Sequence, residues 1–393
     1  MGITEIAKGI EDEIIAIRRK IHENPELSLF EFETAKLVAD YLEDLGIEVR
    51  TEVGGTGVVG LLKGKHPGRT VGLRADMDAL PIEEQTGLAF SSKNKQVMHA
   101  CGHDMHTSVL LGAAKVLSGL RDQIHGNIKF IFQPAEEKAL GAANMMKEGA
   151  LENPHVDFMF CLHTWPKLPE GIIGIRKGAM CASADEIEIE IEGKGGHAAH
   201  PDMCIDPLPI AANIISTIQT IVSREIPPTE SAVVTIGAIH GGSVGNVIPS
   251  NVKMRGTVRT INPDIRERMP GILERIITNS AAAMRGKAKL TYHYGSPPLV
   301  NDDGLVELGS QAIIEEMGPD ALHELKEPSL GGEDFSFYLE KVPGMMFRLG
   351  TRDEREETAL PLHHPSVLFS EKAIVPGITA LSSVALHCLK GRK

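Results

Sequence analysis

The stretch Asp185-Glu-Ile-Glu-Ile-Glu-Ile-Glu192 alternates acidic residues with isoleucine. A period of two is typical of a β-strand with one buried and one solvent-facing side. The residues after it predict a helix over 207–223, strands over 232–239 and 252–260, a helix over 264–284 and a strand over 287–294. This order, β-α-β-β-α-β, is the ferredoxin-like arrangement, so we expect a compact α+β domain over residues 184–296.

The sequence on both sides of this domain has a different pattern. Amphipathic helices over residues 10–21 and 31–45 come first. Short apolar strands then alternate with helical stretches near 105–120 and 139–149; these strands cover 58–62, 71–75, 128–132 and 158–162. After Pro297-Pro298 the pattern resumes with a helix over 303–317, a strand over 345–349 and a last helix to about residue 389. Such alternation favours an α/β domain with a mostly parallel sheet, built from residues 1–183 and 297–393 and interrupted by the inserted domain.

Composition narrows the classes of partner. The chain has 393 residues with 40 Lys+Arg against 53 Asp+Glu, a formal net charge of −13. An acidic surface repels phosphate backbones and anionic lipids, so we expect small-molecule chemistry, with no nucleic acid and no membrane as partner. The apolar runs, such as residues 108–116, are shorter than the ~20 residues of a bilayer span. Five sparse cysteines and an acidic N-terminus without an apolar core predict a cytoplasmic protein.

The strongest chemical motif is Met98-His-Ala-Cys-Gly-His-Asp-Met-His106, which places a cysteine and three histidines just ahead of a predicted helix. These side chains are suited to divalent transition metals. Similar ligand types follow other predicted strands, at Glu136-Glu137, His163 and His363. Because the carboxyl ends of strands in an open α/β sheet form the functional crevice, these groups are candidates for one metal centre.

Paired acids suggest how such a centre would work. In Glu136-Glu137 one carboxylate can bind metal while its neighbour accepts a proton from water, although a solvated acidic turn is the alternative. Asp76 and Asp78 end another strand, where they would orient metal-binding imidazoles or cap the turn.

The inserted domain offers candidate substrate contacts. His197 lies in the glycine-rich stretch 193–201, which would present it at a loop tip. Asn246 and Arg259 could supply an amide and a guanidinium to a substrate carboxylate, although an arginine late in a strand is more often a surface residue. The stretch Gly55–Gly60 matches G-x-G-x-x-G, but a strand follows it where a nucleotide site requires a helix, so we interpret it as a hairpin connection.

Seven motifs in order resemble the M20 metallopeptidase and amidohydrolase family, in particular its branch of N-acyl-amino-acid, hippurate and auxin-conjugate hydrolases. They are MHACGHD (98–104), QPAEE (133–137), LHTWP (162–166), GGHAAHP (195–201), GNVIP (245–249), GGEDFSFY (331–338) and LHHP (362–365). The resemblance implies a catalytic α/β domain interrupted by a ferredoxin-like lid that often dimerises, so we expect a homodimer or a higher homo-oligomer.

Position by position, the resemblance also implies roles for individual residues. The implied metal ligands are Cys101, His103, Glu137, His163 and His363. Glu136 matches the general base, Asp78 the acid that orients a ligand, and His197 the lid histidine that steadies the oxyanion. Asn246 and Arg259 match contacts to the substrate. Two divalent ions, of zinc, manganese, cobalt or nickel, would complete the site.

The expected activity is hydrolysis of an N-acyl-L-amino acid that has a free carboxylate. A metallo-carboxypeptidase or dipeptidase of the same family is the alternative. A cysteine hydrolase that uses Cys101 as nucleophile with His103 beside it, or a binding protein with a degenerate site, would depart further from the motifs. Chelation discriminates, because only the metal mechanism is lost with the ions.

Overall fold

The computed structural model describes residues 2–390, which form two compact units. The large unit runs to Gly178 and also contains Val300–Glu327 and the residues from Asp334 onward; the small unit contains Ala179–Leu299 and Pro328–Glu333. The second segment of the small unit was not expected from the sequence. It joins this unit because the carbonyl of Ser329 accepts a hydrogen bond from the N–H of Ala182.

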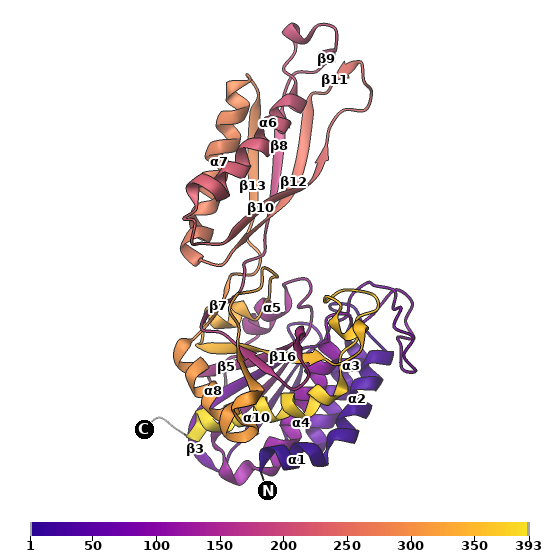
Figure 1. The fold of residues 1–393 in the computed structure, drawn as a ribbon, viewed down its shortest axis with the longest axis vertical. Helices are drawn as coiled ribbons and strands as arrows, with labels where there is room; N and C mark the ends of the chain where they lie inside the picture. The colour runs from indigo at the N-terminus through magenta and orange to yellow at the C-terminus, as the bar shows by residue number, and fades with distance from the viewer. Residues whose placement is uncertain (1, 391–393) are drawn as a thin grey trace. The chain divides into compact units, whose positions relative to one another are not determined.

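The large unit is built on an eight-stranded sheet (Figure 1). In spatial order its strands are β1 (Glu48–Val53), β2 (Gly57–Lys63), β4 (His125–Gln133), β3 (His66–Asp76), β5 (Phe158–Pro169), β16 (Gly344–Arg352), β6 (Ile173–Ile175) and β15 (Leu322–Glu324). The central strands β4, β3, β5 and β16 run parallel, whereas β1, β2 and β4 are joined antiparallel. The expected α/β class with a mostly parallel sheet is confirmed.

Helices of the large unit bury the apolar faces of this sheet. They are α1 (Ile3–Gly9), α2 (Glu11–Glu23), α3 (Phe32–Asp44), α4 (His103–Gly119), α5 (Gly141–Lys147), α8 (Asp303–Met317), α9 (Ser336–Leu339) and α10 (Ile374–Lys390). Helices α4 and α10 pack against each other and against β3. The segment Glu371–Lys390 is long and apolar enough to cross a membrane, but 78% of its apolar window is buried inside the protein, as expected for a core helix.

The small unit contains an antiparallel sheet of β8 (Asp185–Glu192), β10 (Ala232–His240), β12 (Asn251–Thr260) and β13 (Lys287–His293), in the order β10-β12-β8-β13. Helices α6 (Pro207–Thr220) and α7 (Pro263–Ala283) pack on it, which gives the ferredoxin-like arrangement. The isoleucines of β8 are buried in a separate core, as the alternation predicted. Short strands are β9 (Gly196–His197), β11 (Val247–Ile248), β7 (Gly178–Cys181) and β14 (Leu299–Asn301).

Two local expectations have clear outcomes. The Gly55–Gly60 stretch connects β1 and β2 as an antiparallel hairpin, as predicted. The prediction that the strand ends at residue 162 was wrong, because β5 continues to Pro169 and pairs with β16 past His163. His163 therefore lies within a strand.

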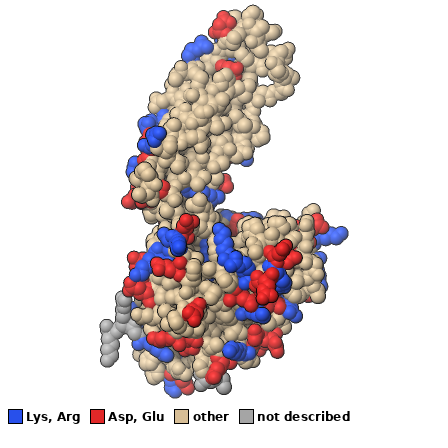
Figure 2. All heavy atoms as spheres, viewed as in Figure 1, with Lys and Arg blue, Asp and Glu red and all other residues tan. Residues whose placement is uncertain are grey.

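The visible face of the large unit carries acidic and basic groups interspersed with one another (Figure 2).

Candidate metal centre

Three neighbouring parallel strands deliver polar side chains to one edge of the large sheet. Asp76 is the last residue of β3 and pairs in register with Gln133, the last residue of β4. On the other side of β3, His163 lies in β5. This edge is the one at which an open α/β sheet forms its crevice.

The loop before α4 brings the cysteine-histidine motif to the same edge. Gly102 has a φ of 85°, a left-handed conformation that favours glycine. A Cβ at this position would lie 2.6 Å from the Oγ1 atom of Thr164. Glycine is thus required here on two grounds, and the tight turn leaves Cys101 and His103 beside the strand that carries His163.

Two groups of potential metal ligands share one cysteine. The first group is Cys101, His103 and His163, and the second is Cys101, Glu137 and His363; within each, the ligand atoms lie within 4.8 Å of one another. The Cys101 Sγ atom is 3.5 Å from His163 Nε2, and Glu137 Oε1 is 3.4 Å from His363 Nε2. The structure thus brings together all five residues proposed as ligands, with Cys101 common to both groups.

Two buried atoms of the cluster have no hydrogen-bond partner. They are Nε2 of His103 and Oε1 of Glu137, and they lie 3.9 Å apart. Buried polar atoms are normally paired, because an unpaired one costs free energy. The Nδ1 atom of His103 is engaged with the carbonyl oxygen of Asp78 at 2.8 Å, so Nε2 is the nitrogen left for a ligand. A cation fits both atoms.

Electrostatics of the cluster favour a cation as well. Burial raises the pKa of the Cys101 thiol, and the charge of Glu137 raises it further. The close approach of Cys101 and Glu137 raises the pKa of His363 to about 10. Burial lowers the pKa of His163, which keeps this imidazole neutral, as metal binding requires. The negative groups that favour a proton on His363 would equally favour a metal ion in its place.

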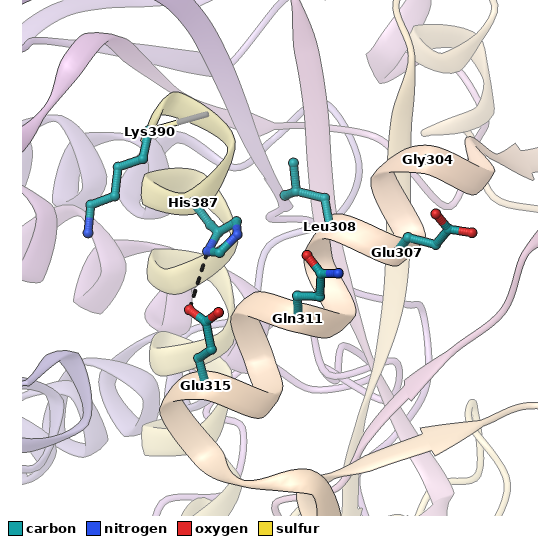
Figure 3. Close-up of a pocket in the computed structure, with 7 residues that line it drawn as sticks. All are labelled: Gly304, Glu307, Leu308, Gln311, Glu315, His387 and Lys390. Atoms are coloured by element: carbon teal, nitrogen blue, oxygen red, sulfur yellow. Dashed lines mark ion pairs between the residues drawn. The ribbon is translucent and has the colours of Figure 1, made fainter. Parts of the chain in front are cut away.

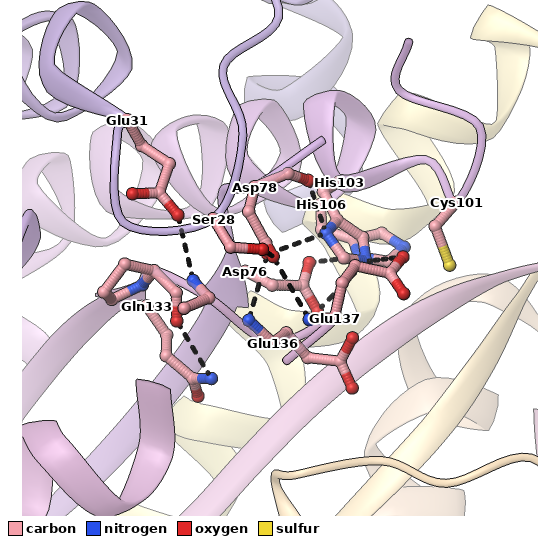
Figure 4. Close-up of polar contacts among 12 residues, drawn as sticks. Ser28, Glu31, Asp76, Asp78, Cys101, His103, His106, Gln133, Glu136 and Glu137 are labelled. Atoms are coloured by element: carbon pink, nitrogen blue, oxygen red, sulfur yellow. Dashed lines mark hydrogen bonds and ion pairs between the residues drawn. The ribbon is translucent and has the colours of Figure 1, made fainter. Parts of the chain in front are cut away.

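Asp78 connects this cluster to the Glu136-Glu137 turn (Figure 4). Its carboxylate accepts hydrogen bonds from the N–H groups of Glu136 and Glu137, both at 3.1 Å, and from the hydroxyl of Ser28 at 2.6 Å. It also lies 3.3 Å from His103 Nδ1. Burial opposes ionisation of Asp78, but the hydrogen bonds from His103 and Ser28 lower its pKa overall. This geometry suits the orienting role predicted for Asp78.

His106 is close to the cluster but is committed elsewhere. It could form a third ligand group with Asp76 and His103. However, His106 Nδ1 lies 2.6 Å from Asp76 Oδ1, and its Nε2 accepts the N–H of Thr164 at 2.8 Å. The hydroxyl of Thr164 in turn donates to the carbonyl of Cys101. His106 therefore holds two ligand-bearing segments together, a role that the sequence did not indicate.

A buried arginine organises the side of the site next to Glu136. Arg74 donates to Asp76 Oδ2 at 2.7 Å, to Asp334 Oδ1 at 2.8 Å and to Gln133 Oε1 at 2.9 Å. The N–H of Asp334 contacts Glu136 Oε1 at 3.4 Å. Asp334 belongs to the GGEDFSFY motif, but no role was predicted for it; its position next to Phe335 was the signal that could have indicated a buried acid.

The predicted residues of the small unit fall at two places. His197 lies in β9, which pairs antiparallel with β11, and the N–H of Ala198 donates to the carbonyl of Asn246, so His197 and Asn246 lie at one exposed two-stranded sheet. Asn246 precedes β12, which begins at Asn251, whereas Arg259 lies near the end of this strand. At about 3.3 Å per residue, Asn251 and Arg259 are roughly 26 Å apart along the strand. The guanidinium of Arg259 contacts the carbonyl of Ser183 at 3.5 Å. Within the small unit, the structure does not bring Arg259 together with the other two.

A hollow elsewhere on the large unit lies between α8 and α10 (Figure 3). It is lined by Gly304, Glu307, Leu308, Gln311, Glu315, His387 and Lys390. Within this lining, Nδ1 of His387 lies 3.6 Å from Oε2 of Glu315, the ion pair marked in Figure 3. None of these residues belongs to the ligand groups, so the hollow is not part of the candidate centre.

Known proteins resemble this chain along most of its length. The sequence pattern of the peptidase family M20/M25/M40 matches residues 72–387. The chain is 41% identical to an N-acetyl-L-cysteine deacetylase of Bacillus subtilis, over 93% of this chain and 86% of the relative. It is 42% identical to thermostable carboxypeptidase 2 of Saccharolobus solfataricus, over 96% of each chain. A crystal structure of a dinuclear metal-binding M20 peptidase from Bacillus subtilis superposes with a TM-score of 0.86 at 36% identity, covering 98% of this chain and 99% of the other.

Proposed function

The chain belongs to peptidase family M20/M25/M40 and is a metal-dependent amide hydrolase, and from this premise we propose that it cleaves N-acyl-L-amino acids. The observation that carries the proposal is the pair of ligand groups that share Cys101, with Glu136 next to the ligand Glu137. The small-molecule substrate would present an amide to this centre and a free carboxylate beside it.

Residues of the large unit are proposed to bind the metal ions and to transfer the proton. Cys101, His103, Glu137, His163 and His363 would hold two divalent cations. Such ions, when bound, lower the pKa of water and polarise an amide carbonyl. Glu136 takes a proton from the attacking water and returns it to the leaving amine. Asp78 fixes the backbone of Glu136 and Glu137, so the base and the neighbouring ligand keep a constant separation.

Residues of the small unit are proposed to contact the substrate. His197 would donate a hydrogen bond to the oxyanion, a contact that typically contributes ~2.7–4 kcal/mol to the transition state. Asn246 and Arg259 would bind polar groups of the substrate. Replacing His197 by alanine should therefore lower kcat by about 100-fold or more with little change in metal content. We expect a homodimer, and the mass measured by light scattering would test this. The cytoplasmic location stays a prediction.

A carboxypeptidase or dipeptidase activity is the second candidate, because the chain is also similar to a protein named as a carboxypeptidase. Both activities cleave an amide next to a free carboxylate, and they differ in whether the acyl group is a simple acid or a peptide. A cysteine hydrolase is not favoured, since Cys101 belongs to both ligand groups and burial raises the pKa of its thiol.

The test is a substrate panel with added Mn²⁺, Co²⁺, Ni²⁺ or Zn²⁺. Acetyl, benzoyl, succinyl and indole-acetyl amino acids are compared with dipeptides and C-terminally blocked peptides. Glu136→Gln should lower kcat by about 100-fold or more, while Glu152→Gln at an exposed position serves as the control. Turnover of peptides alone would favour the second candidate, and full activity of Glu136→Gln would exclude this base.

A further inference from the structure

We propose that Glu31 is a positioning residue for the catalytic turn, holding the backbone from which Glu136 and Glu137 project. This inference rests on the proposed function and assigns a role to a residue that does not touch the metal ligands' side chains. Glu31 is completely buried, although its neighbours Phe30 and Phe32 are each 61% exposed. A charged side chain placed inward between two exposed aromatic residues requires partners in the interior.

The partners of Glu31 are backbone groups of two separate turns and one side-chain hydroxyl. Its Oε1 atom accepts the N–H of Ala135 at 2.9 Å and the N–H of Leu29 at 3.0 Å. Its other oxygen accepts the hydroxyl of Thr56. Figure 4 shows Glu31 reaching the turn from the side opposite the ligand cluster. One carboxylate therefore ties the segment before α3 to the residue that precedes Glu136.

Both turns held by Glu31 have an uncommon backbone conformation. Leu29 has a φ of 72° and Ala135 a φ of 52°, left-handed values that cost free energy in residues with a Cβ. Such conformations persist only where surrounding contacts maintain them. The same oxygen of Glu31 receives the N–H of both residues, so its removal would release both turns together.

The catalytic turn has few other restraints on its backbone donors. Pro134 has no N–H, and the next three N–H groups, those of Ala135, Glu136 and Glu137, all donate to carboxylates outside the turn. Glu31 accepts the first and Asp78 the other two. The N–H groups of this turn are thus held by two buried acids on distant segments, while its carbonyls accept hydrogen bonds from residues 139–141. Asp78 was expected from the sequence, and Glu31 completes the set.

A purely structural role would have a different signature. If Glu31 only stabilised the fold, its loss would lower the melting temperature without selectively lowering kcat. If Glu31 acts through its charge, the neutral isostere would fail as badly as alanine. Glu31→Gln keeps an acceptor for the two N–H groups and an amide for Thr56, so a hydrogen-bonding role predicts that this variant works.

The experiment compares Glu31→Ala, Glu31→Gln and Glu31→Asp with the exposed control Glu33→Ala. Amide hydrogen exchange over residues 133–140 is measured on each protein. The absorption spectrum of the Co²⁺-loaded protein and the melting temperature are also recorded, together with kcat and KM for the N-acyl amino acid that the wild type hydrolyses fastest. We expect Glu31→Ala to exchange at least about 10-fold faster at these amides and to lose about 100-fold in kcat, with KM within about 3-fold. Glu31→Gln and Glu33→Ala should match the wild type.

Two results would overturn the proposal: unchanged exchange over residues 133–140 in a folded Glu31→Ala protein, or equal loss of kcat in the alanine and glutamine variants. If Glu31→Ala does not fold, Glu31→Asp decides, because a carboxylate one methylene shorter cannot reach both turns and should show intermediate exchange and kcat. If the wild type hydrolyses no N-acyl amino acid, the proposed function fails, whereas exchange and the cobalt spectrum still decide the role of Glu31.

Discussion

Replacing Arg74 by methionine should destabilise the large unit strongly. The guanidinium is 1% exposed and neutralises two buried carboxylates, those of Asp76 and Asp334. Breaking a buried ion pair by removing one partner costs about 3–5 kcal/mol, because the remaining charge is left without compensation. Asp76 keeps His106, and Asp334 keeps the amide of Gln133, so we expect the lower end of this range. At about 2 °C per kcal/mol for a unit of this size, about 3 kcal/mol corresponds to a fall of about 6 °C in Tm.

The protein supplies its own probe for this measurement. Trp165 is the single tryptophan of the sequence and lies in β5, so its fluorescence reports on the large unit. Lys36→Met is the matched control, since Lys36 forms an ion pair with Asp40 in which both side chains are more than half exposed. An exposed pair contributes less than about 1 kcal/mol. A melting temperature of Arg74→Met equal to that of Lys36→Met would refute the reasoning.

Three further predictions concern the site. Gly141→Ala should lower both Tm and kcat, because its Cβ would lie 1.7 Å from the carbonyl oxygen of Pro134, whereas Gly119→Ala, with open space around it, should leave both unchanged. His106→Phe should weaken metal binding by about 10–100-fold in a titration, since the residue orients ligand-bearing segments; unaltered affinity would contradict this. Cys101→Ala should lower the content of both metal ions, measured by mass spectrometry, because this residue belongs to both ligand groups; loss of a single ion would contradict a shared thiolate.

The parts of the fold that the sequence predicts are those governed by local pattern. The isoleucines of β8 alternate because one side of the strand faces a core, and that periodicity can be read from eight residues alone. The end of β5 could not be read this way. Trp165 and two prolines interrupt the apolar run, but pairing with β16, more than 170 residues away in the chain, extends the strand past His163. Pairing with a strand so far away in the chain cannot be predicted from the residues around His163.

The same distinction applies to the site. Cys101 and His103 stand out because their side chains have an unusual chemistry within one short motif. Glu31 and Arg74 have no such context: a single acid or arginine in a sequence is most often a solvated surface residue. Their roles follow from burial and from partners on distant segments, for example the 104 positions between Glu31 and Ala135. Ligand chemistry is therefore predictable from the sequence, whereas the contacts that hold the ligands are not.

The net negative charge of the protein bears on how it binds an anionic substrate. A net charge of −13 should oppose binding of a substrate that is itself an anion. However, surface charges are screened over about 8 Å at physiological salt, so the local balance at the centre decides. Two divalent cations, when bound, would add four positive charges beside the negative side chains of the site, among them Glu136, Glu137 and Asp78. Loading with metal would thus remove most of the negative charge of the site, and affinity for the substrate carboxylate would depend on the ions as strongly as catalysis does.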